Sequence, residues 1–326
     1  MREKTVKKVL FLRKKISGEN SIEELAYILI SKIPDLELVI FPETGNSFSK
    51  IVKNICYARK HQGDINHFFS PSDCYVIPFL KNKKVVTWHD VGTGLMSQSV
   101  IKRWIRKKLL MAFPLYFADR LTCISEHTKQ ELKELYSGSE NRSLVIYNCY
   151  NPKLEYTQHT FNTQKPIILQ IGTGMRKNLA HVIEALQGIE CVLYIVGKLS
   201  KEQKRLLNYV SEYDVDFKRI IELYKLCDIV SFPSFYEGFG MPIIEANVTG
   251  RVVLTSRMGA IPEIAGDAVY YVDPHDINDI RKGFLLLIKN VSYRNSLIEK
   301  GRINAKRFTV DKMINSYSEL YTQLAK

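Results

Sequence analysis

Two glutamates flank a glycine turn in the second half of the chain. Glu237 and Glu245 are separated by seven residues, Gly-Phe-Gly-Met-Pro-Ile-Ile. The apolar run Ile229–Phe232 precedes them and predicts a buried strand. Pro242 follows Met241 and favours the start of a helix, because proline needs no N–H donor in a first helical turn. The segment therefore predicts a strand, a loop and a helix that bring two carboxylates to one site.

The chemistry expected of this turn combines an anion with a sugar. Unpaired N–H groups and the positive dipole end at a helix N-terminus attract phosphate. The residues expected to approach a phosphate are Gly238, Phe239, Gly240 and Met241. Carboxylates beside a phosphate are suited to sugar hydroxyls, as an acidic residue holds ribose in dinucleotide folds. We therefore predict that Glu245 contacts a ribose.

A second glycine loop carries basic residues. It follows the apolar run Pro166–Ile171 and has the string Gly-Thr-Gly-Met-Arg-Lys at positions 172–177. Glycines permit close backbone approach, and basic side chains at a helix start supply positive charge. The residues that we expect to bind phosphate are Gly172, Gly174, Arg176 and Lys177.

These motifs resemble those of a known enzyme family. The Glu-x7-Glu spacing and the string Gln-Ile-Gly-Thr-Gly-x-x-Lys-Asn are similar to motifs of the retaining family 4 glycosyltransferases with the GT-B fold. The resemblance extends over nearly the whole chain and is strongest from Gln170 to Glu263. It implies that Lys177 binds the donor pyrophosphate, and on this basis we assign catalytic roles to Lys177 and Glu237.

The diphosphate loop departs from the family pattern at one position. Many members carry an arginine directly after the first glycine, where this chain has Thr173. Whether Arg176 supplies the second charge therefore stays open.

The first half of the chain contributes a histidine. His89 and Asp90 follow the predicted strand Lys84–Trp88, and ligands of parallel sheets bind at the carboxyl ends of strands. The Trp-His-Asp string resembles a family segment in which a histidine faces the donor sugar. The resemblance implies a catalytic role for His89; the alternative is a structural histidine.

The order of the predicted elements indicates an α/β fold. Strands alternate with helices, which favours parallel sheets, and 326 residues suit about two domains. The resemblance implies two Rossmann-like parallel-sheet domains facing across a cleft, with a C-terminal helix crossing back to the first domain. We expect an N-terminal acceptor-binding domain (1–155), a nucleotide-sugar-binding domain (156–308) and a crossover helix (309–326). The polar stretch 150–165 is the predicted linker.

Composition limits the partners and the compartment. The net charge of +13 favours an anionic partner, and six scattered cysteines without a C-x-x-C pair indicate a reduced, cytoplasmic protein. No signal peptide or membrane span is predicted. Residues 101–117 predict a helix with a basic face. That face either lies on an anionic membrane at the inner surface of the cell or is simply solvated.

The resemblance implies transfer of a sugar from a nucleotide-diphosphate-sugar to an acceptor, with retained configuration. The acceptor would be a glycan or lipid-linked glycan in cell-surface polysaccharide synthesis. No cofactor or essential metal is expected, and Asp214-Val-Asp216 is interpreted as incidental. Alternatives are an epimerase or phosphorylase of the same architecture, a nicotinamide oxidoreductase and a nucleic-acid-binding protein. The latter two are disfavoured, because neither G-x-G-x-x-G nor a nucleic-acid module is present.

Overall fold

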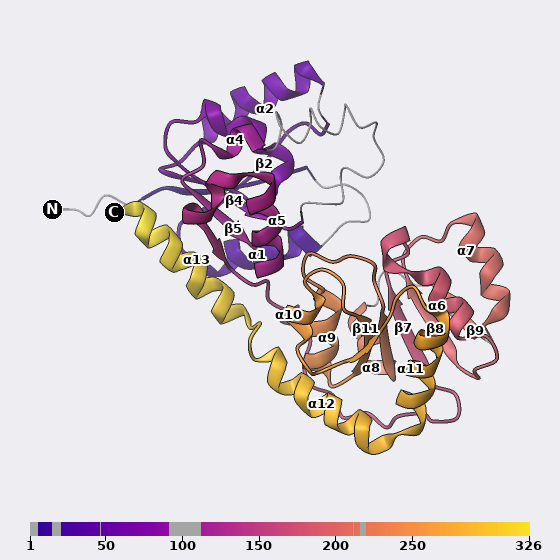
Figure 1. Ribbon diagram of the computed structural model, residues 1–326. Coiled ribbons are helices and arrows are strands. Elements are labelled where there is room, and N and C mark those ends of the chain that lie inside the picture. Colours follow the sequence, from indigo (N-terminus) through magenta and orange to yellow (C-terminus); the bar gives the residue numbers. More distant parts are fainter. Residues whose placement is uncertain (1–5, 15–20, 46, 91–111, 211, 216–219) are drawn as a thin grey trace. The chain divides into compact units, whose positions relative to one another are not determined.

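The computed structural model describes residues 6–14, 21–45, 47–90, 112–210, 212–215 and 220–326. The chain forms two compact units (Figure 1). The first unit comprises residues up to Asn148 together with Val310–Lys326, and the second comprises Cys149–Thr309. No helix among the described residues is long and apolar enough to cross a membrane.

The first unit is built on a parallel sheet. Its strands among the described residues are β1 (Lys8–Leu12), β2 (Leu36–Ile40), β3 (Ile65–Phe68), β4 (Lys83–Trp88), β5 (Arg120–Cys123) and β6 (Ser143–Val145). Their order is β2-β1-β3-β4-β5-β6. The helical segments are α1 (Ser21–Lys32), α2 (Phe48–His61), η1 (Pro71–Phe79), α4 (Phe113–Leu115), α5 (Glu126–Leu135) and η4 (Ser137–Arg142).

An aromatic stack forms the core on one face of this sheet. Phe11 and Phe68 lie on neighbouring strands with ring centroids 5.0 Å apart, and Phe41 stacks on Phe11 at 5.5 Å. Trp88 is fully buried in the same cluster. Successive strand residues point to opposite faces of a sheet. His67 and Thr87, which precede Phe68 and Trp88 in the sequence, therefore point to the other face.

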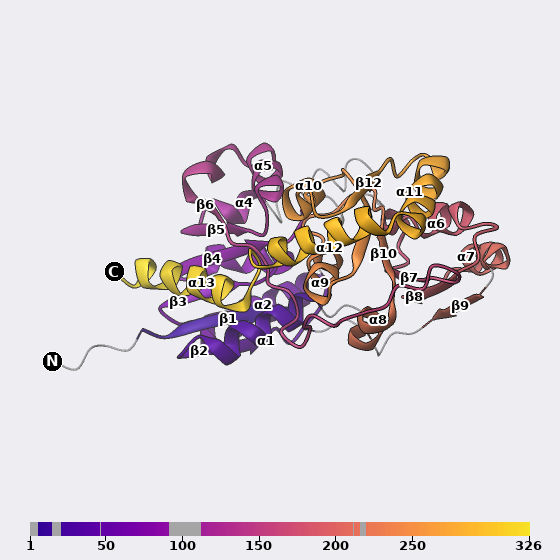
Figure 2. The same ribbon diagram turned by 90° about the horizontal axis from the view of Figure 1, so that it is seen from below.

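That other face receives the C-terminal helix α13 (Val310–Ala325), as Figure 2 shows. His67 is fully buried there, with Nδ1 2.6 Å from the Tyr321 hydroxyl and Nε2 2.7 Å from Thr87 Oγ1. The Tyr317 hydroxyl lies 3.2 Å from Thr87 Oγ1. These contacts confirm the predicted return of the last helix to the first domain.

The second unit has a parallel sheet of the order β12-β11-β10-β7-β8-β9. Its strands among the described residues are β7 (Ile167–Ile171), β8 (Val192–Val196), β9 (Glu212–Val215), β10 (Ile229–Phe232), β11 (Val252–Ser256) and β12 (Tyr270–Val272). The strand order reverses between β7 and β10, which are neighbours. In open parallel sheets, ligands bind beyond the carboxyl ends of the strands at such a reversal.

Helices cover both faces of the second sheet. They are η5 (Met175–Lys177), α6 (Leu179–Ala185), α7 (Lys201–Leu206), η6 (Leu207–Tyr209), α8 (Ile220–Leu226), α9 (Met241–Thr249), α10 (Ile261–Ala265), α11 (Ile277–Lys289) and α12 (Val291–Ala305). Alternate strand residues supply the two apolar cores: Ile168 packs with α6 and α11, while Leu169 packs with α8, α9 and α10. The inner strands β10 and β11 are thus buried on both sides, as expected in a parallel sheet covered by helices.

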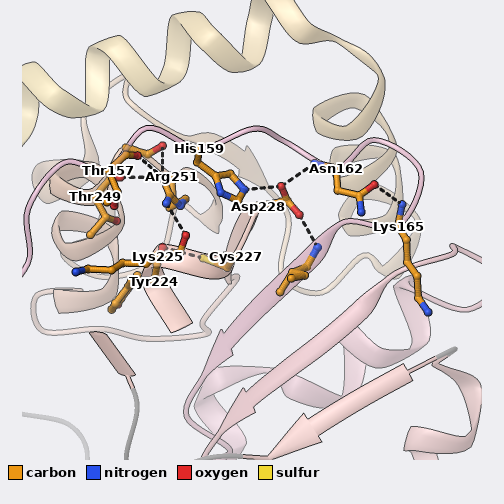
Figure 3. Close-up of polar contacts among 12 residues, drawn as sticks. Thr157, His159, Asn162, Lys165, Tyr224, Lys225, Cys227, Asp228, Thr249 and Arg251 are labelled. Atoms are coloured by element: carbon orange, nitrogen blue, oxygen red, sulfur yellow. Dashed lines mark hydrogen bonds and ion pairs between the residues drawn. The ribbon is translucent and has the colours of Figure 1, made fainter. Parts of the chain in front are cut away.

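The predicted linker has no helix or strand, yet it is fastened to the second unit. Asp228 is buried and accepts hydrogen bonds from His159 Nε2 at 2.7 Å and from the backbone N–H groups of Asn162 and Ile167. Buried Arg251 donates to the Thr157 carbonyl at 3.0 Å (Figure 3). The boundary between the units accordingly falls between Asn148 and Cys149, earlier than the predicted residue 155.

Asp214, which belongs to the Asp-Val-Asp interpreted as incidental, lies in β9, a short edge strand whose side chains are largely exposed. Helix α10 begins at Ile261, directly after Gly259 and Ala260. Residues 101–111 of the predicted basic helix and Asp216 lie outside the described residues.

The buried His67 predicts a pH-dependent stability. Burial, with a smaller electrostatic contribution from His89, lowers the pKa of His67 to about 3, so the folded state keeps the ring neutral. The unfolded chain takes up a proton as the pH falls below about 6.5, and stability present above that pH is lost. We expect His67 to account for a loss of about 2 kcal/mol in the free energy of unfolding near pH 5.

The measurement is the thermal midpoint of wild type and His67→Gln at about pH 7 and about pH 5. His67→Gln should lower the midpoint at neutral pH but reduce its fall on acidification. The exposed His275, changed to Gln, serves as the control and should keep the wild-type fall. An identical pH dependence in wild type and His67→Gln would contradict the prediction.

Candidate active site

Two predicted catalytic residues meet at the reversal of the second sheet. Lys177 ends the turn that follows β7, and Glu237 lies in the loop that follows β10. Lys177 Nζ lies 2.6 Å from Glu237 Oε1. The Glu237 side chain is 9% exposed and that of Lys177 is 21% exposed. A charge-assisted contact is thus sheltered at the strand ends where a ligand is expected.

Glycines allow two close approaches at this site. Gly172 has φ +89°, and a Cβ there would lie 2.8 Å from Lys177 Cγ. Gly259 has φ +59°, and a Cβ there would lie 2.4 Å from the Glu237 carbonyl oxygen. Both positions therefore require glycine for two reasons: the positive φ, and the lack of space for a Cβ atom. Gly259 was not among the predicted site residues.

An aromatic ring contacts the Lys177 side chain, and hydrogen bonds fix the backbone at this residue. Its ammonium lies 4.5 Å from the centroid of the Phe232 ring, within range of a cation–π contact. The Lys177 carbonyl accepts a hydrogen bond from Gln170 Nε2 at 2.9 Å. The next residue, Asn178, is left-handed (φ 61°) and its side-chain amide donates to the carbonyls of Pro233 and Pro274. This framework fixes the ammonium at the strand ends.

The rest of the predicted diphosphate loop forms a turn around Lys177. The Gly174 carbonyl accepts from the Lys177 backbone N–H at 2.8 Å. The Arg176 carbonyl accepts from the Phe235 N–H at 2.8 Å, which ties this loop to the segment after β10. Thr173, where many family members have arginine, donates its hydroxyl to the Lys198 carbonyl at 2.7 Å.

The Gly238–Met241 turn leads directly into α9. Gly240 has φ +106° and caps the helix, and Met241 is its first residue. The Phe239 side chain is 3% exposed and packs edge-on against Phe308 at 5.7 Å. The predicted ligand contact of Phe239 therefore has to involve its backbone. Helix α9, like other helices, presents the positive end of its dipole at this turn.

Glu245 lies one turn inside α9 and is half-buried. The Tyr224 hydroxyl donates to Glu245 Oε2 at 2.7 Å. Tyr224 is fully buried in α8, and burial together with the charge of Glu245 raises its pKa well above the usual value. The hydroxyl consequently keeps its proton and donates. Sequence reasoning missed Tyr224, because it occupies one of the apolar positions of a short helix.

His89 follows β4 in the first unit, whereas the other predicted site residues belong to the second. Its Nε2 lies 2.9 Å from the Phe69 carbonyl oxygen, and the two rings pack edge-on at 5.2 Å. Burial lowers the pKa of His89 to about 4. The ring is therefore neutral near pH 7, with its N–H on Nε2 and its acceptor nitrogen at Nδ1.

The arrangement in the second unit suits an anionic ligand with a hydroxyl-bearing group. A sheltered ammonium and a helix N-terminus attract negative charge, and two carboxylates accept hydrogen bonds from hydroxyls. In the described part of the chain, no three His, Cys, Asp or Glu side chains gather in a way that could hold a metal ion.

Comparisons with known proteins show which family the chain is related to. A family model described as "Glycosyltransferase Family 4" matches residues 14–154, and one described as "Glycosyl transferases group 1" matches 154–304. An Escherichia coli protein named O-antigen chain mannosyltransferase B is 35% identical over 284 residues, which are 76% of this chain and 73% of that protein. An uncharacterised glycosyltransferase of Methanocaldococcus jannaschii is 25% identical over 99% of this chain and 93% of its own length.

A solved structure extends the likeness to the fold. Anabaena HepE, crystallised with UDP and glucose, is 17% identical and has a TM-score of 0.78 over 97% of this chain and 100% of its own. The predicted resemblance is thereby confirmed: the chain has the GT-B fold and belongs to glycosyltransferase family 4.

Proposed function

We propose that this glycosyltransferase moves a sugar from a nucleoside-diphosphate sugar to a glycan or lipid-linked glycan in the synthesis of a cell-surface polysaccharide, with retained anomeric configuration. The observation that carries the proposal is the sheltered Lys177–Glu237 contact beside the N-terminus of α9. The mannosyltransferase named above acts in O-antigen synthesis by its name, and the Anabaena structure contains UDP and glucose. Both support a nucleotide-sugar donor and a polysaccharide product.

Lys177 acts on the leaving group in this proposal. As the glycosidic bond breaks, the departing nucleoside diphosphate gains negative charge on its terminal phosphate. The Lys177 ammonium is already fixed by Phe232 and Glu237 and needs little reorganisation to stabilise that charge. The N–H groups of the turn before α9 act in the same direction, and Arg176 is the candidate for the charge that an arginine at Thr173 would have supplied.

Glu237 and His89 serve the sugar rather than the phosphate. Glu237 presents a carboxylate next to the Lys177 ammonium, so it can accept donor-sugar hydroxyls close to the breaking bond. The neutral His89 offers Nδ1 as a hydrogen-bond acceptor. We propose front-side attack, in which the acceptor hydroxyl transfers its proton to the departing phosphate as the new bond forms on the same face.

We place the reaction in the cytoplasm, with residues 101–117 meeting an anionic membrane surface and with no role for nucleic acid. The support is the run of basic residues at 102–108 and the aromatic residues that follow this run within the same segment. The basic residues are Lys102, Arg103, Arg106, Lys107 and Lys108. Among the described residues, Phe113 and Tyr116 are 51% and 61% exposed. Basic and aromatic side chains together favour the interface of an anionic bilayer.

Replacing Lys177 tests the leaving-group role. Lys177→Ala should lower turnover about 10²–10³-fold, because one preorganised charge that acts on the developing anion is lost. The measurement is the release of nucleoside diphosphate from a panel of nucleotide-sugars, together with thermal shifts on donor binding. Lys282→Ala removes an exposed lysine of α11 and should behave as wild type. Wild-type binding and turnover by Lys177→Ala would refute the site assignment.

Replacing Glu237 separates binding from turnover. Glu237→Gln keeps the shape but removes a negative charge that competes for Lys177 and repels a diphosphate. We expect the affinity for the nucleoside diphosphate to hold or rise, while turnover falls by about 10² or more. Titration calorimetry and initial rates give the two quantities. Glu299→Gln, on exposed Glu299 of α12, is the control. Parallel losses of binding and turnover would count against this role.

The proposal includes turnover without an added metal ion, because Lys177 and the α9 N-terminus supply the positive charge that a divalent ion supplies elsewhere. Enzyme treated with EDTA should keep its rate, and so should Asp214→Ala. A rate that EDTA abolishes and that only Mg²⁺ or Mn²⁺ restores would show that the reaction needs a metal.

A further inference from the structure

A buried tyrosine is hydrogen-bonded to Glu245, the predicted ribose-binding glutamate. The Tyr224 ring packs in the apolar core between the sheet and helices α8, α9 and α10, and no part of the side chain is exposed. Its hydroxyl donates to Glu245 Oε2 at 2.7 Å. The bond joins neighbouring helices, since Tyr224 lies in α8 and Glu245 in α9. The half-buried carboxylate is therefore held from its inner side.

The end of α8 that carries Tyr224 is itself fixed. The Lys225 carbonyl accepts a hydrogen bond from buried Arg251 at 2.7 Å, and the Cys227 thiol donates to the Tyr224 carbonyl at 3.7 Å. Asp228 then anchors the segment from His159 to Ile167. Figure 3 shows this succession from Tyr224 to Asp228 beside Arg251. A side chain on so constrained a backbone holds its hydroxyl in one place.

A purely structural role explains this bond poorly. Replacing both members of a buried hydrogen-bonded pair by apolar groups of the same shape is often nearly neutral, so stability alone does not call for the pair. Held at Oε2, however, the carboxylate loses rotamer freedom and presents Oε1 in a fixed direction. Such support by a neighbouring hydrogen bond is what a precise ligand contact needs.

We propose that Tyr224 is a positioning residue: it holds Glu245 Oε2 so that Oε1 receives the ribose hydroxyls of the donor nucleotide. The site then selects ribonucleoside diphosphates over analogues without these hydroxyls. This inference rests on the proposed function, because it needs a nucleoside diphosphate to occupy the site.

The test compares one nucleotide with and without its ribose hydroxyls. UDP and GDP are titrated calorimetrically into the full-length enzyme, and the tighter binder is compared with its 2′,3′-dideoxy counterpart. We expect wild type to prefer the ribonucleotide by about tenfold or more, the effect of a hydrogen bond to a charged group. Tyr224→Phe should lower that preference by about three- to tenfold and leave the affinity of the dideoxy form unchanged.

Two further variants define the result. Glu245→Gln should remove most of the preference, and adding Tyr224→Phe to it should have no further effect, because both changes act on one contact. Tyr321→Phe is the matched control: it also deletes a buried, hydrogen-bonded tyrosine hydroxyl, but in the first unit. It should lower the melting temperature and leave the ribonucleotide preference at the wild-type value.

The outcomes distinguish this inference from the proposed function. If wild type binds neither UDP nor GDP nor any nucleotide-sugar of the panel, the proposed function fails and this inference with it. If wild type prefers the ribonucleotide but Tyr224→Phe weakens both forms equally, Tyr224 is structural and only the inference is overturned. The same holds if the two changes, Tyr224→Phe and Glu245→Gln, act additively.

Discussion

The contact between the Lys177 ammonium and the Glu237 carboxylate joins the two loops that follow the neighbouring strands β7 and β10. A carboxylate as sheltered as Glu237 needs a partner, because an isolated charge is costly away from water. The Lys177 side chain lies so close to the backbone at 172 that only glycine fits there, and the loop after β11 lies so close to the Glu237 backbone that only glycine fits at 259. The strand reversal, the two glycines and the ion pair occur together at the carboxyl edge of the sheet.

The corner between α8 and β10 lies at the amino ends of the strands and is linked to the site through Tyr224. Within five residues, Tyr224 bonds to Glu245, the Lys225 carbonyl bonds to Arg251, and Asp228 holds the segment around His159. The same five residues thus hold both the connecting segment and the helix that carries Glu245. We infer that they contribute both to the rigidity of the second unit and to the orientation of Glu245.

Much of this architecture follows from local sequence signals. Gly240 and Pro242 mark the start of α9, and the apolar runs at 167–171 and 229–232 mark the strands on either side of the reversal. Strand β9 escaped prediction because its exposed edge position removes the apolar pattern. The anchoring of the linker and the role of Tyr224 depend on partners such as Arg251 and Glu245 that are distant in sequence. No pattern in one segment reports such pairings.

Helix α13 has a consequence for the order in which the protein matures on the ribosome. The first unit makes up the start of the chain, yet the polar face around His67 is covered by Tyr317 and Tyr321 near its end. During synthesis from the N-terminus the second unit is made before α13. Until α13 is made, the polar groups of His67 and Thr87 on the N-terminal sheet therefore lack their tyrosine partners. The sheet that is synthesised first is therefore covered only after α13 has been synthesised.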